Sequence, residues 1–183
     1  PYRWAKKIFK WREYDDIPKV FVEGYVLLWF FVILLLFYEL QSENSKLKYI
    51  LLGLAFWRLA DILLEKLRIV IVEFQDSQKT GGERVLKTRG GVRWVLLTLI
   101  NIAEVILCFA VVYHFWGSNF CGEIQGKIVA IYYSIVTITT LGYGEIHPNT
   151  YPSHLLVIMQ LAYFLFLLLT ILPIVVSIFK VRE

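Results

Sequence analysis

Charged residues are scarce in this chain of 183 residues: Asp, Glu, Lys and Arg make up 19% of it, whereas a typical soluble domain has about 25%. Hydrophobic residues make up 58%. Apolar runs of roughly 20 residues, the length that crosses about 30 Å of hydrocarbon, recur along the chain. The composition excludes an ordinary soluble domain and predicts an all-α integral membrane protein.

Cysteine is also rare, with two residues, Cys108 and Cys121, whose number and spacing exclude a disulfide framework and a zinc site. No catalytic nucleophile, metal cluster or phosphate-binding loop is recognisable, so we expect no catalytic residue and no enzyme. No internal repeat is evident, which argues against a transporter built from inverted repeats. The net charge of +4 lies in short basic segments beside apolar runs, which indicates membrane orientation rather than nucleic-acid binding.

Four apolar segments predict four transmembrane helices. In chain order they cover 20–40, 49–74, 94–116 and 153–179. The first two form an N-terminal pair over 20–74, and the second helix of that pair is the least apolar of the four. Each segment is long enough to cross a bilayer as a helix.

Basic residues give the expected orientation. Most Lys and Arg lie in a basic and aromatic segment at 1–19, typical of a helix in the membrane interface, and in a basic loop expected over 75–93. Because an even number of spans separates them, both segments and both termini are predicted to be cytoplasmic. The chain would be a multi-pass protein of the cell membrane, surrounded by lipid. The sequence leaves open whether a cytoplasmic ligand-sensing domain outside this chain is a further partner.

The region between the third and fourth spans is too short for another full crossing. An apolar stretch at 127–139 predicts a re-entrant helix that enters halfway and runs into an extended segment at 140–144. Non-helical backbone is tolerated at membrane depth only where it is buried in protein or lines water. We therefore expect this region to line a pore.

The residues of the extended segment suit the binding of a dehydrated ion. Gly142 and Gly144 let backbone carbonyls turn toward an axis in conformations that other residues resist. Thr140 adds a hydroxyl oxygen, while Leu141 and Tyr143 are expected to point backward and anchor the strand against surrounding helices. The C-terminal end of the short helix directs partial negative charge toward the ion path.

The run Thr140-Leu141-Gly142-Tyr143-Gly144 resembles the T-V-G-Y-G signature of potassium channels. The resemblance extends over a pore domain at 94–183, with an outer helix at 94–116, a pore helix at 127–139, a selectivity filter at 140–144 and an inner helix at 153–179. It implies a potassium-selective channel subunit with K⁺ as the permeant ion. One filter copy cannot close a ring, so the resemblance also implies a homotetramer.

Several positions beside the filter match the same family. Tyr132 and Tyr133 match an aromatic pair that supports the filter, and Glu145 matches an acid that can bond to this pair. Thr139, which precedes the filter, is a further supporting residue. Val136 departs from the pattern because some members have a carboxylate there, so inactivation controlled by an acid pair is not expected.

The inner helix lacks the central glycine that many members of the family use as a hinge. Phe164 stands where that glycine would align, and Pro173 follows nine residues later. Proline removes a backbone hydrogen bond and kinks a helix, so we expect the bend nearest the gate at Pro173. The alternative is a hydrophobic constriction made by Phe164, Phe166 and Leu169.

Four charged residues of the second span, Arg58, Asp61, Glu65 and Arg68, are spaced three, four and three apart and share one helical face. Two are positive and two negative, whereas a voltage sensor needs several like charges. We expect ion pairing with a neighbouring helix rather than voltage sensing of the usual kind. Glu104, in the middle of the third span, is the expected partner of Arg58.

Two other functions remain open: a weakly selective cation channel, and a subunit of a potassium-transport or regulatory membrane complex. Tyr143 argues against the first, and the single intact filter argues against the second. His147 and His154 lie near the outer mouth, where external acid would modulate the current if they act on conduction. Solvated histidines without a function are the alternative.

Overall fold

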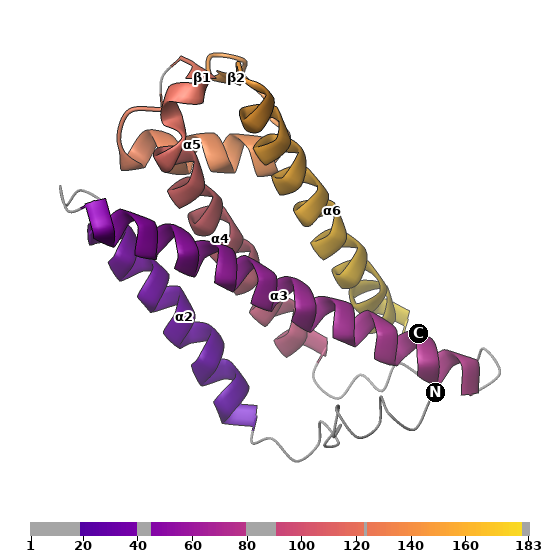
Figure 1. The fold of residues 1–183 in the computed structure, drawn as a ribbon. Coiled ribbons are helices and arrows are strands. Elements are labelled where there is room, and N and C mark those ends of the chain that lie inside the picture. Colours follow the sequence, from indigo (N-terminus) through magenta and orange to yellow (C-terminus); the bar gives the residue numbers. More distant parts are fainter. Residues whose placement is uncertain (1–18, 40–44, 80–90, 123, 181–183) are drawn as a thin grey trace, which may run out of the picture.

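The computed structural model describes residues 19–39, 45–79, 91–122 and 124–180 (Figure 1). The predicted interfacial segment at 1–19 lies outside the described residues except for Lys19. Within the described ranges the chain is mostly helical. The helices are α2 (Lys19–Glu39), α3 (Ser45–Lys79), α4 (Gly91–Phe115), α5 (Lys127–Ile138) and α6 (Tyr151–Lys180).

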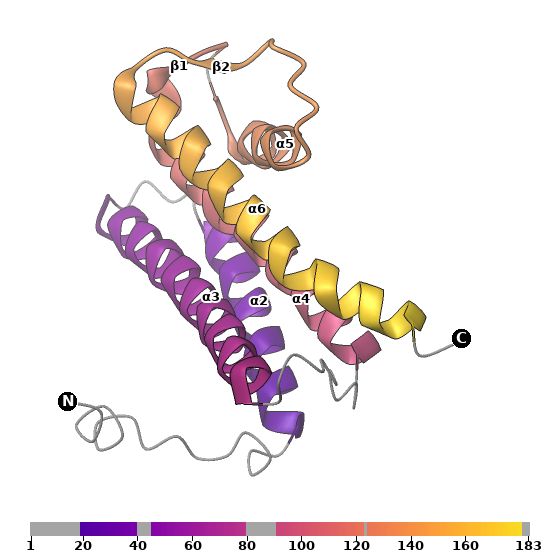
Figure 2. The same ribbon diagram turned by 90° about the vertical axis from the view of Figure 1, so that its right-hand side faces the viewer.

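Helix α4 is the central element, because α2, α3, α5 and α6 all pack against it. Figures 1 and 2 show α6 running along one side of α4, with α2 and α3 on another side. The short helix α5 lies across the ends of α4 and α6. This arrangement places the predicted pore helix between the predicted outer and inner helices.

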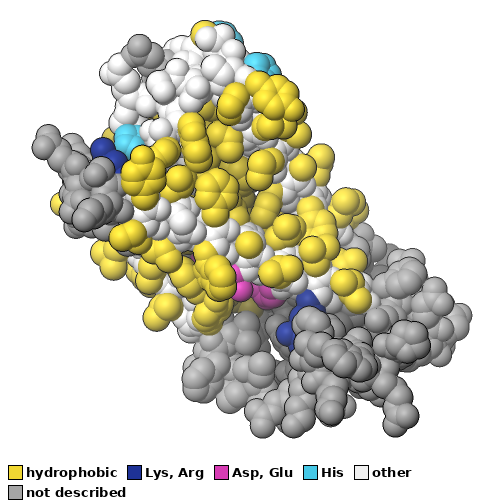
Figure 3. Space-filling model, in the orientation of Figure 1, with side chains coloured by type: hydrophobic (Ala, Val, Ile, Leu, Met, Phe, Trp, Pro, Cys, Tyr) yellow, Lys and Arg dark blue, Asp and Glu magenta, His cyan; other side chains and the backbone are white. Residues whose placement is uncertain are grey.

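The exterior of the molecule is apolar, unlike that of a soluble protein. Large apolar side chains of α2, α3 and α6 are exposed, and Figure 3 shows hydrophobic side chains spread along the bundle between backbone and other side chains. Most of the buried residues in the described ranges are hydrophobic, and the buried polar ones are Arg58, Lys66, Thr98, Asn101, Glu104, Ser134, Ser153 and Gln160. An apolar exterior suits a protein whose surroundings are lipid or other apolar subunits, and polar groups buried inside it are candidates for function.

Two helices among the described residues are long and apolar enough to cross a membrane, at Val95–Phe115 and Tyr151–Leu172. They are the predicted outer and inner helices. The N-terminal pair does not meet the same criteria, since the described apolar part of α2 is the shorter segment Gly24–Leu35 and α3 carries charges along its length. The length and composition of the described helices therefore support two of the four predicted spans.

The prediction of a loop over 75–93 was wrong at both ends, because α3 continues to Lys79 and α4 already begins at Gly91. Gln and Lys are good helix formers, so a polar sequence after an apolar one need not end a helix. Glycine is tolerated at the N-terminus of a helix, so Gly91 need not delay the start of α4. Residues 80–90 lie outside the described residues.

The all-α prediction missed a small antiparallel pair, β1 (Phe120–Cys121) and β2 (His147–Pro148). Phe120 faces Pro148 and Cys121 faces His147. Two residues are too few to produce an alternating sequence pattern, so the pair left no signal in the sequence. It joins the segment before α5 to the segment after the predicted filter.

Candidate functional site

The end of α5 sets the path of the predicted filter. The amide groups of Thr139, Thr140 and Leu141 donate to the carbonyls of Ile135, Thr137 and Val136 at 3.0, 3.1 and 3.1 Å. Thr139 Oγ1 also donates to the Ile135 carbonyl, at 2.6 Å. These bonds close the last turn of the helix, and the chain leaves it at Thr140.

Thr140 is the one non-glycine residue with a positive φ among the described residues, at 57°. A β-branched residue is rare in this region because its side chain crowds the backbone. Such strain persists only where the surrounding structure holds it, and it is concentrated at functional sites. The conformation therefore marks Thr140 as a constrained residue at the start of the predicted filter.

The glycines of the predicted filter also have positive φ, 56° at Gly142 and 85° at Gly144. Nothing lies within 4 Å of a Cβ added at either position in the single chain. The requirement for glycine is thus conformational rather than steric. Between Leu141 and Tyr143 the backbone forms neither helix nor strand.

The side chains of the filter segment are not packed in the way the sequence predicted. Leu141 is 57% exposed and Tyr143 is 65% exposed, although both were expected to anchor the strand against surrounding helices. The helices of one chain do not supply enough surface for this anchoring. Tyr143 does line a cavity of about 370 Å³ between α5, the filter segment and α6.

The two tyrosines of the predicted aromatic pair have different surroundings. Tyr132 donates a hydrogen bond to Glu145 Oε1, which links α5 to the residue after the filter. Tyr133 is buried, and its ring packs 4.9 Å from the ring of Tyr113 and 5.2 Å from that of Phe120. Tyr132 contacts the acid, and Tyr133 holds α5 to α4. Val136, at the position where some family members have a carboxylate, is buried.

The segments on either side of α5 and the filter are bound to each other. The amide of Asn149 donates to the Asn119 carbonyl at 3.2 Å, next to the β1–β2 pair. Gly122, with φ of 90°, lies so close to the chain after the filter that an added Cβ would be 2.3 Å from the Glu145 carbonyl oxygen. The outer ends of the pore helix and the filter segment are therefore held at short range by backbone contacts.

A buried ionic centre lies where α2, α3 and α4 meet. Arg58 donates to Glu104 Oε2 from Nη2 at 2.7 Å and from Nε at 3.1 Å, as predicted, and it bonds Asp61 Oδ2 at 2.5 Å. Tyr25 donates to Asp61 at 3.0 Å, and its ring and that of Trp29 lie 5.3 and 5.5 Å from the guanidinium. The sequence did not indicate these two aromatic partners.

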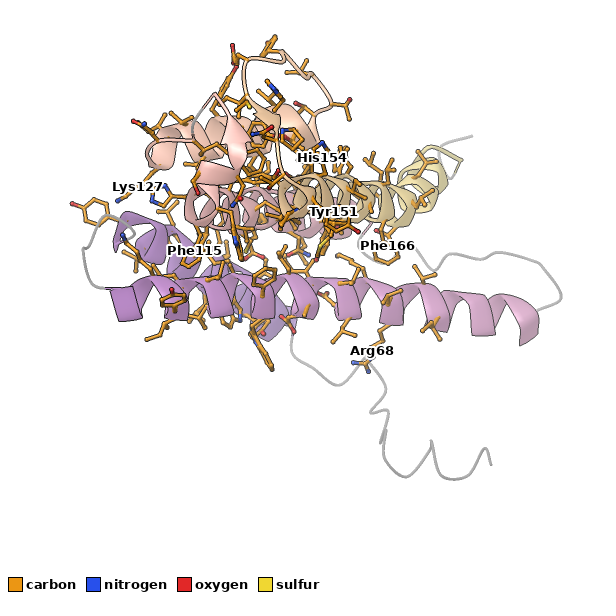
Figure 4. All side chains as sticks on the ribbon, turned by 45° about the horizontal axis from the view of Figure 1, so that its top comes forward. Arg68, Phe115, Lys127, Tyr151, His154 and Phe166 are labelled. Atoms are coloured by element: carbon orange, nitrogen blue, oxygen red, sulfur yellow. The ribbon has the colours of Figure 1, made fainter. Side chains whose placement is uncertain are left out.

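The charged residues of the predicted stripe on α3 differ in exposure. Asp61 and Glu65 are half-buried, and Arg68 is exposed and projects from α3 on the side away from α6 (Figure 4). Lys66, which was not on the stripe, is buried and donates to Thr98 of α4 at 3.3 Å. A buried lysine in a predicted span was itself a signal that the sequence analysis overlooked.

The predicted gate residues lie within α6. Phe164 packs against the core of the chain, whereas Leu169 is 70% exposed. The helix continues past Pro173 to Lys180. The Phe164 and Leu169 side chains therefore lie on different faces of α6, and one face of the helix cannot present both of them to the predicted hydrophobic constriction. The bend at Pro173 remains a prediction.

The two histidines near the outer mouth are exposed. His147 belongs to β2, and His154 lies in the first turn of α6, where its Nδ1 is 2.8 Å from the Thr150 carbonyl oxygen (Figure 4). Figure 4 also shows Lys127 at the start of α5, close to the end of α2. The Lys127 ammonium donates to the Tyr38 carbonyl and lies 5.3 Å from the Tyr38 ring.

Residues 101–181 match a family model described as "Ion channel". The match begins in α4, includes α5 and the filter segment, and ends just after α6. Comparisons with curated proteins and with solved structures found no match. The match covers less than half of the chain and supports an ion channel domain over these residues, in a family that is not a class of enzymes. The match supports the resemblance of this part of the chain to the potassium channel pore family that the filter sequence indicated.

Proposed function

We propose that the chain is one subunit of a homotetrameric channel that conducts K⁺ passively and selectively through residues 140–144. The observation that carries this proposal is the backbone after α5: positive φ at Thr140, Gly142 and Gly144 in alternate positions. Alternation of this kind lets successive carbonyls face one side of the strand. Rings of such carbonyls replace the hydration shell of the ion.

The exposure of the filter segment supports assembly. Every residue from Thr139 to Glu145 is exposed in the single chain, and so are Leu165, Leu168, Leu169 and Leu172 of α6. A ring of four chains would bring the filter strands around one axis and cover these surfaces with neighbouring subunits. Leu141 and Tyr143 would then find in the adjacent subunits the packing that their own chain lacks.

The N-terminal pair completes the proposed topology. Exposed apolar residues along α2 and α3 suit contact with lipid, while Arg58 and Lys66 of α3 are buried and bond to Glu104 and Thr98 of α4. We propose that both helices span the membrane, which gives four spans, cytoplasmic termini and an external β1–β2 pair. The mixed signs of the α3 charges support gating by a stimulus other than voltage.

The test is the reversal potential of the purified chain in planar bilayers, with K⁺ on one side and Na⁺ on the other. We expect reversal near the K⁺ equilibrium potential for the unchanged chain and loss of this selectivity in Gly142→Ala. The matched control is Gly53→Ala, since Gly53 lies within α3 and a Cβ there meets nothing within 4 Å. Reversal near zero in the unchanged chain would instead favour a weakly selective cation channel.

A second measurement tests the assembly. Native mass spectrometry in detergent is expected to give a mass of four chains of 21.5 kDa each, apart from bound detergent and lipid. A monomer or dimer that conducts K⁺ selectively would refute the proposed ring of four filters.

A further inference from the structure

A buried polar cluster joins three helices next to the filter, and the sequence analysis did not identify it. It consists of Tyr113 of α4, Ser134 of α5 and Gln160 of α6, each fully buried. The Tyr113 hydroxyl donates to Gln160 Oε1 at 2.5 Å. Gln160 Nε2 donates to both the carbonyl oxygen and Oγ of Ser134, at 2.9 Å each. We refer to these three residues as the Gln160 cluster.

Only one orientation of the Gln160 amide gives every donor in the Gln160 cluster an acceptor. The Ser134 hydroxyl donates to the Ile106 carbonyl at 2.9 Å, so toward Gln160 it can only accept. The amide nitrogen supplies two donors, one for each Ser134 oxygen, and the amide oxygen accepts from Tyr113. A reversed amide would place its oxygen against the Ser134 carbonyl, leaving two acceptors without a donor. The orientation of the Gln160 side chain is therefore fixed by its partners.

Burying three polar side chains between membrane helices is costly, so we expect the Gln160 cluster to have a function. A buried polar group that loses its partner costs about 1–3 kcal/mol, and an apolar side chain could fill the same space without that risk. Polar residues inside the membrane region are therefore functional candidates. What distinguishes this cluster is its position, because it bonds the backbone of the helix that leads into the filter.

The geometry of α5 connects Ser134 to the filter. Thr140 follows Ser134 by six residues, about 9 Å along a helix axis. Helix α5 ends at Ile138, and the Thr140 amide donates to the Thr137 carbonyl, so a displacement at Ser134 would reach the first residue of the filter. A binding site for a dehydrated ion tolerates displacements of only about 0.5 Å. Small movements between α5 and α6 would thus change ion binding.

We propose that Gln160 is a positioning residue for the filter, holding α5 to the inner helix and thereby setting where Thr140 begins. This inference rests on the proposed function. It also divides α6 into two parts. The part from Tyr151 to Gln160 moves together with α5, and bending of the inner helix during gating takes place beyond Gln160, on the side of Pro173.

The experiment compares Gln160→Met, which removes all three hydrogen bonds at similar volume, with Met159→Leu. Met159 is the preceding residue of α6 and is 51% exposed, so it controls for a substitution in the same turn. In planar bilayers we expect Gln160→Met to lower the permeability ratio of K⁺ to Na⁺ about tenfold, which corresponds to a loss of about 1.4 kcal/mol in the preference of the filter for K⁺. Tyr113→Phe is expected to give a smaller change in the same direction, because Gln160 still bonds Ser134.

Hydrogen–deuterium exchange supplies a readout that does not depend on conduction. The amides of residues 139–145 are expected to exchange faster in Gln160→Met than in the unchanged chain, and at the original rate in Met159→Leu. If Gln160→Met does not assemble, Tyr113→Phe serves as the test variant. Unchanged permeability ratio and unchanged exchange in an assembled variant would overturn the positioning role. Lack of selectivity in the unchanged chain would refute the proposed function, while the exchange rates would still decide the role of Gln160.

Discussion

Removing one partner of the Arg58–Glu104 pair should destabilise the protein more than removing both. In Glu104→Met, Arg58 is fully buried and loses two hydrogen bonds of 2.7 and 3.1 Å, retaining Asp61 and the rings of Tyr25 and Trp29. Breaking a buried pair in this way costs about 3–5 kcal/mol in a soluble protein. Because Asp61 still neutralises the guanidinium, we expect the lower end, about 3 kcal/mol per chain.

The assay is equilibrium unfolding in mixed micelles with increasing SDS, followed by tryptophan fluorescence. Arg58→Met combined with Glu104→Met is expected to recover at least half of the loss, because neither charge then remains buried without its partner. Glu65→Gln, which neutralises a half-buried carboxylate of α3, is the control and should change the free energy of unfolding by less than about 1 kcal/mol. Additive losses in the double variant would refute the argument that the two charges act as a pair.

Three further substitutions test individual contacts. Tyr132→Phe removes the bond to Glu145, so single-channel recordings should show shorter openings at unchanged conductance; unchanged open times would show that the bond does not support the filter. Tyr163→Phe removes the 2.7 Å hydrogen bond from the hydroxyl to the Leu59 carbonyl and should lower the free energy of SDS unfolding by about 1 kcal/mol. An unchanged free energy would mean that the hydrogen bonds within α3 alone satisfy that carbonyl. Gly122→Ala places a Cβ 2.3 Å from the Glu145 carbonyl, so native mass spectrometry should detect less tetramer; a normal yield would mean that the outer loops adjust freely.

The sequence predicted the long elements of the fold because membrane helices leave a strong signal. Runs of apolar residues at 94–116 and 153–179 correspond to α4 and α6 within three residues at each end. Both ends of α3 were missed by more than this, since polarity marks the edge of the hydrocarbon rather than the end of a helix. The β1–β2 pair left no pattern, and its existence depends on contacts between segments 27 residues apart.

For the candidate site, the sequence was informative where the chemistry allows few residue types. It was uninformative where the role of a side chain depends on which partner the fold brings near it. Gly142 and Gly144 could be predicted because positive φ favours glycine, and Glu104 because a carboxylate at that depth requires a cation. The partner of Gln160 could not be predicted, since an amide can bond to any exposed backbone or hydroxyl group that packing brings near it. Thr140 likewise shows its strained conformation only in the folded chain.

The contacts of the N-terminal pair explain why it need not be a separate sensor. It is bound to each helix of the pore domain: to α4 through Arg58 and Glu104, to α5 through Lys127 and the Tyr38 carbonyl, and to α6 through the Tyr163 hydroxyl and the Leu59 carbonyl. A sensor that slides or rotates relative to the pore would have to break bonds to all of these helices together. Since Leu59 follows Arg58 directly, a movement of α3 that disturbs the ionic centre also disturbs the inner helix three residues beyond Gln160. The contacts therefore couple any movement of α2 and α3 to α4, α5 and α6, in keeping with the proposed gating by a stimulus other than voltage.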